Sequence, residues 1–451
     1  FGRLGYNYKQ RYLLEFTFRR DGSSTFGEGN RWANFPSVAV GWSFSEEPFI
    51  KRLTGGWLNW GKIRGSYGKS GQTFTSAYLA HGLMNIMDKS FFGKTGITTD
   101  KPVSPYLTWE KTRQYDLGLD MDMFNYRLNV KLDYYYKYTS SLIYDIPIPG
   151  SLYAFGAQVE NAMEISNEGL ELELQADILR ESAVSWRMKF NMARNWNRFE
   201  KSYSGKDVVD GDGTLLVVGR PLNGLYVWAH RGYYNSDAEV PRLYKIDGQE
   251  IYFNGVATNG ISGAVGDYRL LDLDGDGNPD SYYAGSPLPL AHGGWVNELM
   301  WKNFDLNVLV NFTIGRKMIN NRMGLGFSRQ SEDGHLTKLF DYRKLRPWDG
   351  VNKKPNAPAW GNSLSMNTDS AIEKVHHLAL KQITLGYNLP DRISKKAGLS
   401  GVRFFLTAEN LFYLSNYSGG NPEVVNIYTG RDNGDTYPLP RKYTLGLTLN
   451  F

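Results

Sequence analysis

The chain contains 451 residues, of which 14% are aromatic and none is cysteine, so a disulfide framework, a thiolate metal site and catalysis by cysteine are excluded. The 51 Lys and Arg residues barely exceed the 46 Asp and Glu residues, and the net charge of +5 is spread along the chain, which gives nucleic-acid binding little support. No stretch approaches the roughly 18 consecutive apolar residues of a membrane-spanning helix, so a helical membrane protein is not expected.

Alternation of apolar and polar residues recurs in segments of about ten residues, the length at which a tilted strand crosses the hydrocarbon core. In residues 115–123, the carboxylates of Asp116, Asp120 and Asp122 share one face, and apolar or aromatic side chains occupy the other. Further along the chain, residues 170–178 oppose apolar side chains to Glu, Gln and Asp. The remaining segments with this pattern are residues 128–138, 184–192, 304–314 and 443–451.

The polar faces of these segments decide between two all-β architectures. A soluble β-sandwich also alternates, and one such segment alone would favour the sandwich. Taken together, faces rich in carboxylates, amides and glycine suit a wide, wet lumen better than a dry core between two sheets. We therefore predict an all-β fold, a transmembrane antiparallel β-barrel in contact with the lipid bilayer.

Short and long connections alternate along the chain, as they do in barrels with short periplasmic turns and long external loops. The short connections are residues 9–10, a turn around 125, 180–183 and 302–303, with somewhat longer ones at 46–56 and 390–400. The long connections are residues 22–34, 71–111, 140–165, 199–290, 316–374 and 414–441. This order predicts about thirteen strands, the first and the last of which both run toward the periplasm.

Thirteen strands do not close a bacterial barrel, because such barrels normally have an even number of strands and both ends in the periplasm. The sequence also begins at Phe1 without a methionine or a signal peptide. We therefore interpret residues 1–451 as the C-terminal part of a larger barrel, in a truncated or cleaved chain whose first strands lie upstream.

Several short sequence blocks, in a fixed order through nearly the whole chain, resemble the SusC/RagA-like TonB-dependent outer-membrane transporters. Each block alone is weakly specific, and their order makes the resemblance specific. Among them are Phe18-Arg-Arg-Asp-Gly-Ser-Ser24, Ser45-Glu-Glu-Pro-Phe49, Ile63-Arg-Gly-Ser-Tyr-Gly68, Leu107-Thr-Trp-Glu-Lys-Thr112, Asn167-Glu-Gly-Leu-Glu-Leu172, Ala408-Glu-Asn-Leu-Phe412 and Tyr437-Pro-Leu-Pro-Arg441.

The resemblance implies a plugged barrel of about 22 strands in the cell outer membrane. The N-terminal plug domain, the TonB box and the first strands of such a barrel are absent from this sequence. The resemblance also implies import of a large nutrient, an oligosaccharide or, less favoured, an oligopeptide. Its implied partners are a SusD-like lipoprotein lid and the TonB–ExbB–ExbD complex, which would act through the missing N-terminal region.

Two other functions stay open at this stage. A passive outer-membrane porin would have upstream strands but neither plug nor TonB box. A secreted, calcium-binding β-sandwich acting on glycans would lack the terminal aromatic strand. We predict no enzymatic activity and no organic cofactor. No histidine pair has the spacing of a metal site, so metal catalysis has no support. Ser66 and Lys69 match the Ser-x-x-Lys pattern only within an alternating strand, not at the start of a helix.

An Asp-rich motif in the long extracellular loop, residues 199–290, matches the first part of a calcium-binding loop. Alternating carboxylates converge on one hard cation, a glycine permits the sharp turn, and a backbone carbonyl adds a ligand. The candidate calcium ligands are Asp272, Asp274, Asp276, Asn278 and Asp280. Tyr283 stands where a bidentate Glu would complete the loop, so an ordinary acidic turn is an equal alternative.

Four aromatic residues in the same loop are candidates for contact with a substrate or a partner protein. Tyr and Trp offer flat faces to sugar rings or peptide side chains and lose little conformational entropy on binding. The four are Tyr226, Trp228, Tyr233 and Tyr234. The simpler alternative, which we favour, is that such residues brace the loops against each other.

Overall fold

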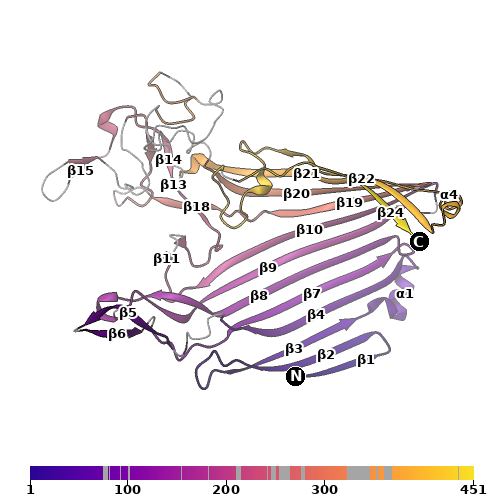
Figure 1. The fold of residues 1–451 in the computed structure, drawn as a ribbon, viewed down its shortest axis with the longest axis horizontal. Helices are drawn as coiled ribbons and strands as arrows, with labels where there is room; N and C mark the ends of the chain where they lie inside the picture. Colours follow the sequence, from indigo (N-terminus) through magenta and orange to yellow (C-terminus); the bar gives the residue numbers. More distant parts are fainter. Residues whose placement is uncertain are drawn as a thin grey trace.

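One large sheet dominates the chain in the computed structural model (Figure 1). Thirteen of its fourteen strands follow one another on a single antiparallel path in chain order, which confirms the prediction of about thirteen strands for the described residues. These are β1 (Gly2–Tyr8), β2 (Tyr12–Gly22), β3 (Trp32–Trp42), β4 (Leu58–Gln72), β7 (Glu110–Met123), β8 (Leu128–Pro147), β9 (Ala157–Leu179), β10 (Val184–Lys201), β19 (Ala291–Trp301), β20 (Phe304–Asn320), β21 (Ile372–Asn388), β22 (Gly401–Ser415) and β24 (Lys442–Asn450).

The structure describes residues 1–74, 80, 82–91, 93–99, 102–153, 155–180, 182–209, 215–240, 242–244, 250–252, 265–275, 280–321, 346–351, 354–359, 368–434 and 436–451. Short strands lie in the connections: β5 (Met84–Phe91), β6 (Lys94–Thr99), β11 (Val208–Val209), β12 (Leu215–Leu216), β13 (Leu225–Trp228), β14 (His230–Tyr233), β15 (Arg242–Tyr244), β16 (Glu250–Tyr252), β17 (Tyr268–Leu270), β18 (Ser281–Gly285) and β23 (Arg431–Asp432). The helices are α1 (Pro48–Thr54), α2 (Gly150–Tyr153) and α4 (Asp391–Ser394), with 3-10 turns η1 (Phe44–Glu46), η2 (Asp237–Glu239), η4 (Asp369–Ala371), η5 (Lys395–Ala397) and η6 (Pro422–Val424). None of the described helices has the length and apolar character needed to cross a membrane.

Strand register gives the sheet one apolar and one polar face. Cross-strand partners point to the same side, so Leu14, Val40 and Leu117 lie in one apolar row through the pairs Leu14↔Val40, Val40↔Gly65 and Gly65↔Leu117. The apolar face is exposed on this chain, with Leu14 47% and Leu117 58% accessible. Exposure of this kind is expected where lipid, and not protein, covers the side chains.

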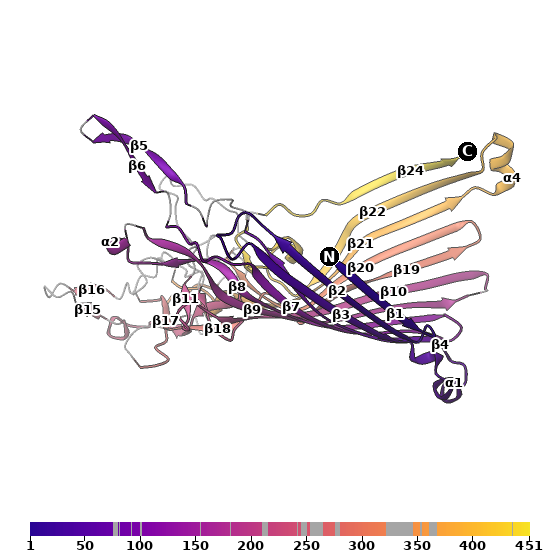
Figure 2. The ribbon, with the colours of Figure 1, turned by 90° about the horizontal axis from the view of Figure 1, so that it is seen from below.

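The sheet curves strongly (Figure 2). Residues of its polar face surround the space on the concave side. Polar-face side chains from β8 to β21 line one cavity of about 770 Å³; Lys131, Glu173, Lys189 and Asn311 are among them. Polar side chains on the inside and apolar side chains on the outside form the wall of a membrane barrel. The alternation seen in the sequence therefore predicted both faces correctly.

Short turns gather at one end of the sheet and long connections at the other (Figures 1 and 2). The β1–β2 turn is tight because Lys9 (φ 52°) and Gln10 (φ 55°) both adopt left-handed backbone conformations and the Arg11 amide donates to the Tyr8 carbonyl at 3.0 Å. We call the two ends the short-turn end and the long-connection end.

One predicted connection, residues 140–165, is wrong. β8 and β9 stay paired as far as Pro147↔Ala157, so only residues 148–156 join them. The register shifts between Thr139 and Leu142, and Ser141 has a φ of 60°. Such a bulge moves later side chains to the opposite face, so the hairpin continues while the alternation in the sequence breaks.

Candidate functional site

The polar face carries ion pairs that cross from strand to strand. The Arg64 guanidinium on β4 lies 3.0 Å from the Asp120 carboxylate on β7 and 2.5 Å from the Asp133 carboxylate on β8. Further pairs are Lys131–Glu173, Arg187–Asp177, Lys189–Glu298 and Arg403–Asp305. Each partly exposed pair contributes about 0–1 kcal/mol. Their main consequence is a charged, hydrated inner wall.

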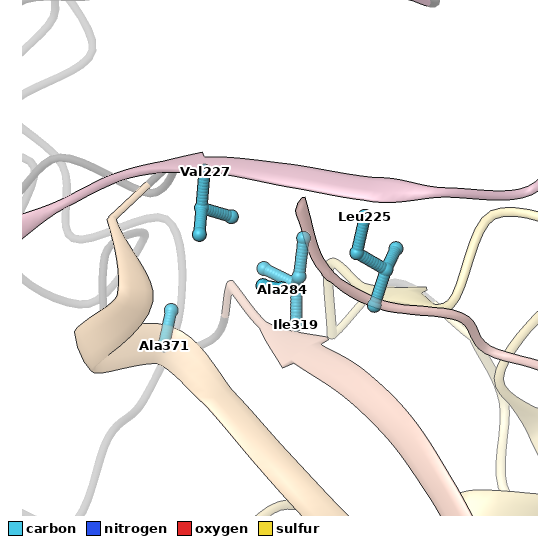
Figure 3. Close-up of a cluster of buried hydrophobic side chains, with 5 residues drawn as sticks. All are labelled: Leu225, Val227, Ala284, Ile319 and Ala371. Atoms are coloured by element: carbon cyan, nitrogen blue, oxygen red, sulfur yellow. The ribbon is translucent and has the colours of Figure 1, made fainter. Parts of the chain in front are cut away.

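A small hydrophobic cluster fastens the loop between β10 and β19, residues 202–290, to the ends of two long strands. Leu225 and Val227 of β13 point toward Ala284 of β18, Ile319 of β20 and Ala371 of η4 (Figure 3). Ile319 is fully buried and Val227 is 1% exposed. Burial of side chains of this size stabilises by about 1.5–3 kcal/mol each, so the base of the loop is held firmly on the sheet.

Two of the four candidate aromatic residues line a cavity at the long-connection end. β13 places Tyr226 and Trp228 next to the cluster residues Leu225 and Val227, at the base of the loop. There they line a cavity of about 770 Å³ together with Tyr428 from the connection between β22 and β24. This volume is within the range of small-molecule sites in proteins.

The other two candidate aromatic residues have bracing positions. The Tyr233 ring stacks on Tyr268 with 5.4 Å between ring centroids, and Tyr234 is only 4% exposed. Neighbouring polar groups that the sequence did not single out complete the brace: Asp369 accepts hydrogen bonds from His230 and, at 3.2 Å, from the Tyr282 hydroxyl. Trp228 takes part in both arrangements, because it lines the cavity and also packs against Tyr268 and Leu270. Contact of any of the four residues with a substrate stays a prediction.

Tyr226 gives the cavity a testable pH dependence. Burial, followed by the neighbouring Tyr283, raises the pKa of its phenol from 10.0 to about 12, and the hydroxyl has no hydrogen-bond partner among the described atoms. Since the folded pKa exceeds the unfolded one, the neutral phenol stabilises the loop below pH 10 and this contribution is lost as the pH rises toward 12. We expect Tyr226→Phe to reduce alkaline loosening of the loop, measured by proteolysis at pH 9 and pH 11.5. Equal loosening of both proteins at pH 11.5 would contradict this assignment.

Three of the five predicted calcium ligands come together in the structure. Carboxylate oxygens of Asp272, Asp274 and Asp280 all lie within 4.8 Å of one another. Backbone amides shape the turn: Asp272 accepts from Gly275 at 2.6 Å, and Asp280 accepts from Leu273 at 2.5 Å. The other two predicted ligands, Asp276 and Asn278, lie outside the described residues. Hard oxygen donors at this separation fit a calcium ion.

A segment of the β22–β24 connection, residues 416–434, folds onto the polar face; we call it the inner strap. Arg316 of β20 holds it, donating from its guanidinium to the carbonyls of Pro422 (3.1 Å), Val425 (3.0 Å) and Asn426 (2.6 Å). Arg316 is 5% exposed, and sequence reasoning missed it because no motif surrounds it.

A carboxylate adds a second attachment of the inner strap. Glu423 lies 3.6 Å from His377 Nε2 and 3.2 Å from Lys381 Nζ. The hydrogen bond with His377, followed by the Lys381 ammonium, holds the pKa of Glu423 below its usual value. The inner strap therefore closes part of the space in front of the wall and narrows any path along it.

The antiparallel sheet is curved, with an apolar side toward lipid, a charged concave side and the long loops at one end. These features define a membrane-spanning β-barrel of the outer-membrane class. Residues 1–285 match the family model described as TonB dependent receptor-like, beta-barrel. The chain therefore belongs to this family of outer-membrane proteins, and its relatives are of the SusC/RagA type.

The comparisons with individual proteins agree with this assignment. The chain is 32% identical to TonB-dependent receptor P26 of Formosa agariphila, over 100% of the chain and 46% of the relative. It is 29% identical to TonB-dependent receptor SusC of Bacteroides thetaiotaomicron, over 100% of the chain and 43% of the relative. A chain of the RagAB peptide importer in its closed-closed state has the same fold, with a TM-score of 0.79 and 24% identity over 100% of this chain and 47% of that one. The chain thus spans less than half of each of these proteins.

Proposed function

We propose that the protein containing this wall imports a large nutrient across the outer membrane in a TonB-dependent manner. The observation that supports the proposal is the charged concave wall with the inner strap in front of it, together with a loop cavity lined by Tyr226, Trp228 and Tyr428. A wet inner wall suits polar cargo, and a partly closed path suits gated rather than free passage. No enzymatic step is part of this proposal.

An oligosaccharide is the cargo that we favour, and an oligopeptide is the alternative. Flat aromatic side chains at the mouth of a cavity suit sugar rings, and Tyr428 is 70% exposed there. RagAB is described as a peptide importer, and at 24% identity this likeness supports the fold and leaves the cargo to experiment. The proposed partners are a SusD-like lipoprotein that covers the long-connection end and the TonB–ExbB–ExbD complex.

Uptake by cells that carry the full-length protein tests this proposal. Labelled oligosaccharides and peptides are supplied to cells with and without a functional TonB complex, and to cells with the variant Trp228→Ala plus Tyr428→Ala. We expect glycan uptake that requires TonB and falls at least tenfold in the variant. Uptake that persists without TonB would favour the passive porin. Uptake of peptides but not of oligosaccharides would contradict the proposed cargo and still agree with TonB-dependent import.

We also propose that the turn containing Asp272, Asp274 and Asp280 binds calcium. The converging carboxylates support this, since they repel one another without a cation. We expect 1 mM calcium to protect the loop against proteolysis, and EGTA to reverse the effect. The variant Asp272→Asn plus Asp274→Asn should lose the calcium effect, whereas Asp237→Asn in the same loop should keep it. If magnesium protects the loop equally, or if calcium does not protect it, the motif is an ordinary acidic turn and not a calcium site.

A further inference from the structure

A row of cations lies on the apolar, lipid-facing side of the sheet near the long-connection end. Lys69 of β4 and Arg113 of β7 are direct cross-strand partners, and Gly71↔Lys111 is the next pair on the same face. The side chains of Lys69, Lys111 and Arg113 are exposed. Charged residues are expensive on a lipid-facing surface, so a row of three needs a physical reason.

The apolar face marks the depth of this row in the membrane. One row closer to the middle of the sheet, Tyr67, Tyr115 and Tyr136 form an aromatic band, with ring centroids 4.8 Å and 6.3 Å apart. The rows beyond them contain Leu117 and Leu119. An aromatic band at the edge of an apolar band marks the interface between hydrocarbon and headgroups. The cations therefore lie at the level of the lipid headgroups.

These cations have no anionic partner among the described residues. None of them takes part in an ion pair there, in contrast to Arg64 on the polar face of β4 and Lys131 on the polar face of the neighbouring strand β8. Like charges directly opposite each other destabilise a strand pair. The Lys69↔Arg113 pair therefore favours an external anion that neutralises both charges.

A cavity beside the row has room for such an anion. β3 and β4 pair only as far as Ser37↔Gly68, and beyond this point the two strands separate. The space left between them is a cavity of about 320 Å³, lined by the three cations and by Trp32, which is 63% exposed. Ammonium and guanidinium groups are the side chains that bind phosphate best, and an indole ring packs against the apolar part of a lipid.

We propose that Lys69, Lys111 and Arg113 bind the phosphate of a phosphorylated lipid headgroup in the outer leaflet. The long-connection end of an outer-membrane barrel faces outward, which selects that leaflet. The phosphate enters the gap between β3 and β4, and the lipid chains continue along the apolar face below the tyrosine band. The bound lipid thus covers a part of the wall where backbone pairing stops. This inference is independent of the proposed import function.

Lipid binding by the full-length protein in detergent tests the proposal. The probe is lipid A carrying its phosphates, and the comparison is dephosphorylated lipid A, each titrated and counted by native mass spectrometry. We expect K69Q/K111Q/R113Q to weaken binding of the phosphorylated probe about a hundredfold, because each of the three cations near a lipid surface contributes roughly fivefold. The charge-retaining K69R/K111R/R113K should bind nearly as well as the unaltered protein.

A second triple variant controls for total charge. Lys9, Lys302 and Lys396 are exposed cations at the short-turn end, so K9Q/K302Q/K396Q changes the net charge equally and should not weaken binding. Heat-modifiable gel migration checks that each barrel is folded, and Lys69→Gln replaces the triple variant if that check fails, with a fall of about fivefold expected. The proposal is overturned by unchanged binding in K69Q/K111Q/R113Q, by an equal loss in the control, or by complete displacement of the lipid with inorganic phosphate.

Discussion

Replacing Arg316 by methionine is expected to release the inner strap from the polar face. Methionine keeps most of the side-chain length but removes all donors, so the carbonyls of Pro422, Val425 and Asn426 each lose a charge-assisted hydrogen bond. The Pro422 and Asn426 carbonyls keep the backbone amides of Val425 (3.4 Å) and Gly430 (2.9 Å) as donors. A hydrogen bond to a charged group contributes about 1.5–3 kcal/mol, so loss of the three gives a local loss of roughly 3 kcal/mol or more. This loss corresponds to opening of the inner strap about a hundredfold more often.

Hydrogen exchange measures this release. The Ile319 amide donates to the Gly430 carbonyl at 2.8 Å and the Asn321 amide to the Asp432 carbonyl at 3.0 Å, so both amides report on attachment of the inner strap. The matched variant is Lys381→Met, which removes only one ion pair to Glu423 and should change exchange less than about fivefold. Equal exchange in Arg316→Met and the unaltered protein would show that Arg316 does not hold the inner strap.

The strands were predictable because each one carries its own signal. In residues 115–123, Asp116 and Asp120 must face water while Leu117 and Leu119 face lipid, and a period of two is the only local solution that satisfies both. No partner strand has to be known for this inference. The conclusion fails where the signal is interrupted, as at Ser141, where a bulge ended the alternation but not the hairpin.

The loop site was only partly predictable, since its contacts join residues far apart in the sequence. Arg316 meets its carbonyl partners 106 to 110 residues away, and no local pattern distinguishes it from any other strand arginine. The four aromatic residues were found from composition, yet only the folded loop places Tyr226 at a cavity and stacks Tyr233 on Tyr268. The composition of the loop was enough to select the four aromatic residues as candidates, but their positions depend on tertiary contacts that the sequence does not show.

The second large effect is expected at Gly293, where β19 approaches β10 too closely for any side chain. A Cβ atom at this position would lie 2.1 Å from the Asn191 carbonyl oxygen and 2.9 Å from the Met192 Cα. Both obstacles are backbone atoms in the paired β10–β19 ladder, so no side-chain rotation relieves the contact. Overpacking typically costs about 1–3 kcal/mol, and we expect Gly293→Ala at the upper end of that range.

The matched control for Gly293→Ala is Gly65→Ala, in the middle of the same sheet. Its nearest contacts, Val40 Cγ2 at 3.7 Å and the Asp116 carbonyl oxygen at 3.8 Å, leave room for a methyl group, so its unfolding midpoint should barely move. Urea unfolding in detergent compares the two variants. If only Gly293→Ala lowers the urea unfolding midpoint, the effect comes from the close contact in the β10–β19 ladder. The chain returns to the sheet at this ladder after residues 202–290. The two substitutions remove the same backbone freedom of a glycine and differ only in the atoms that the new methyl group contacts. An equal fall of the unfolding midpoint in both variants would therefore assign the effect to lost backbone flexibility, which any strand glycine would show.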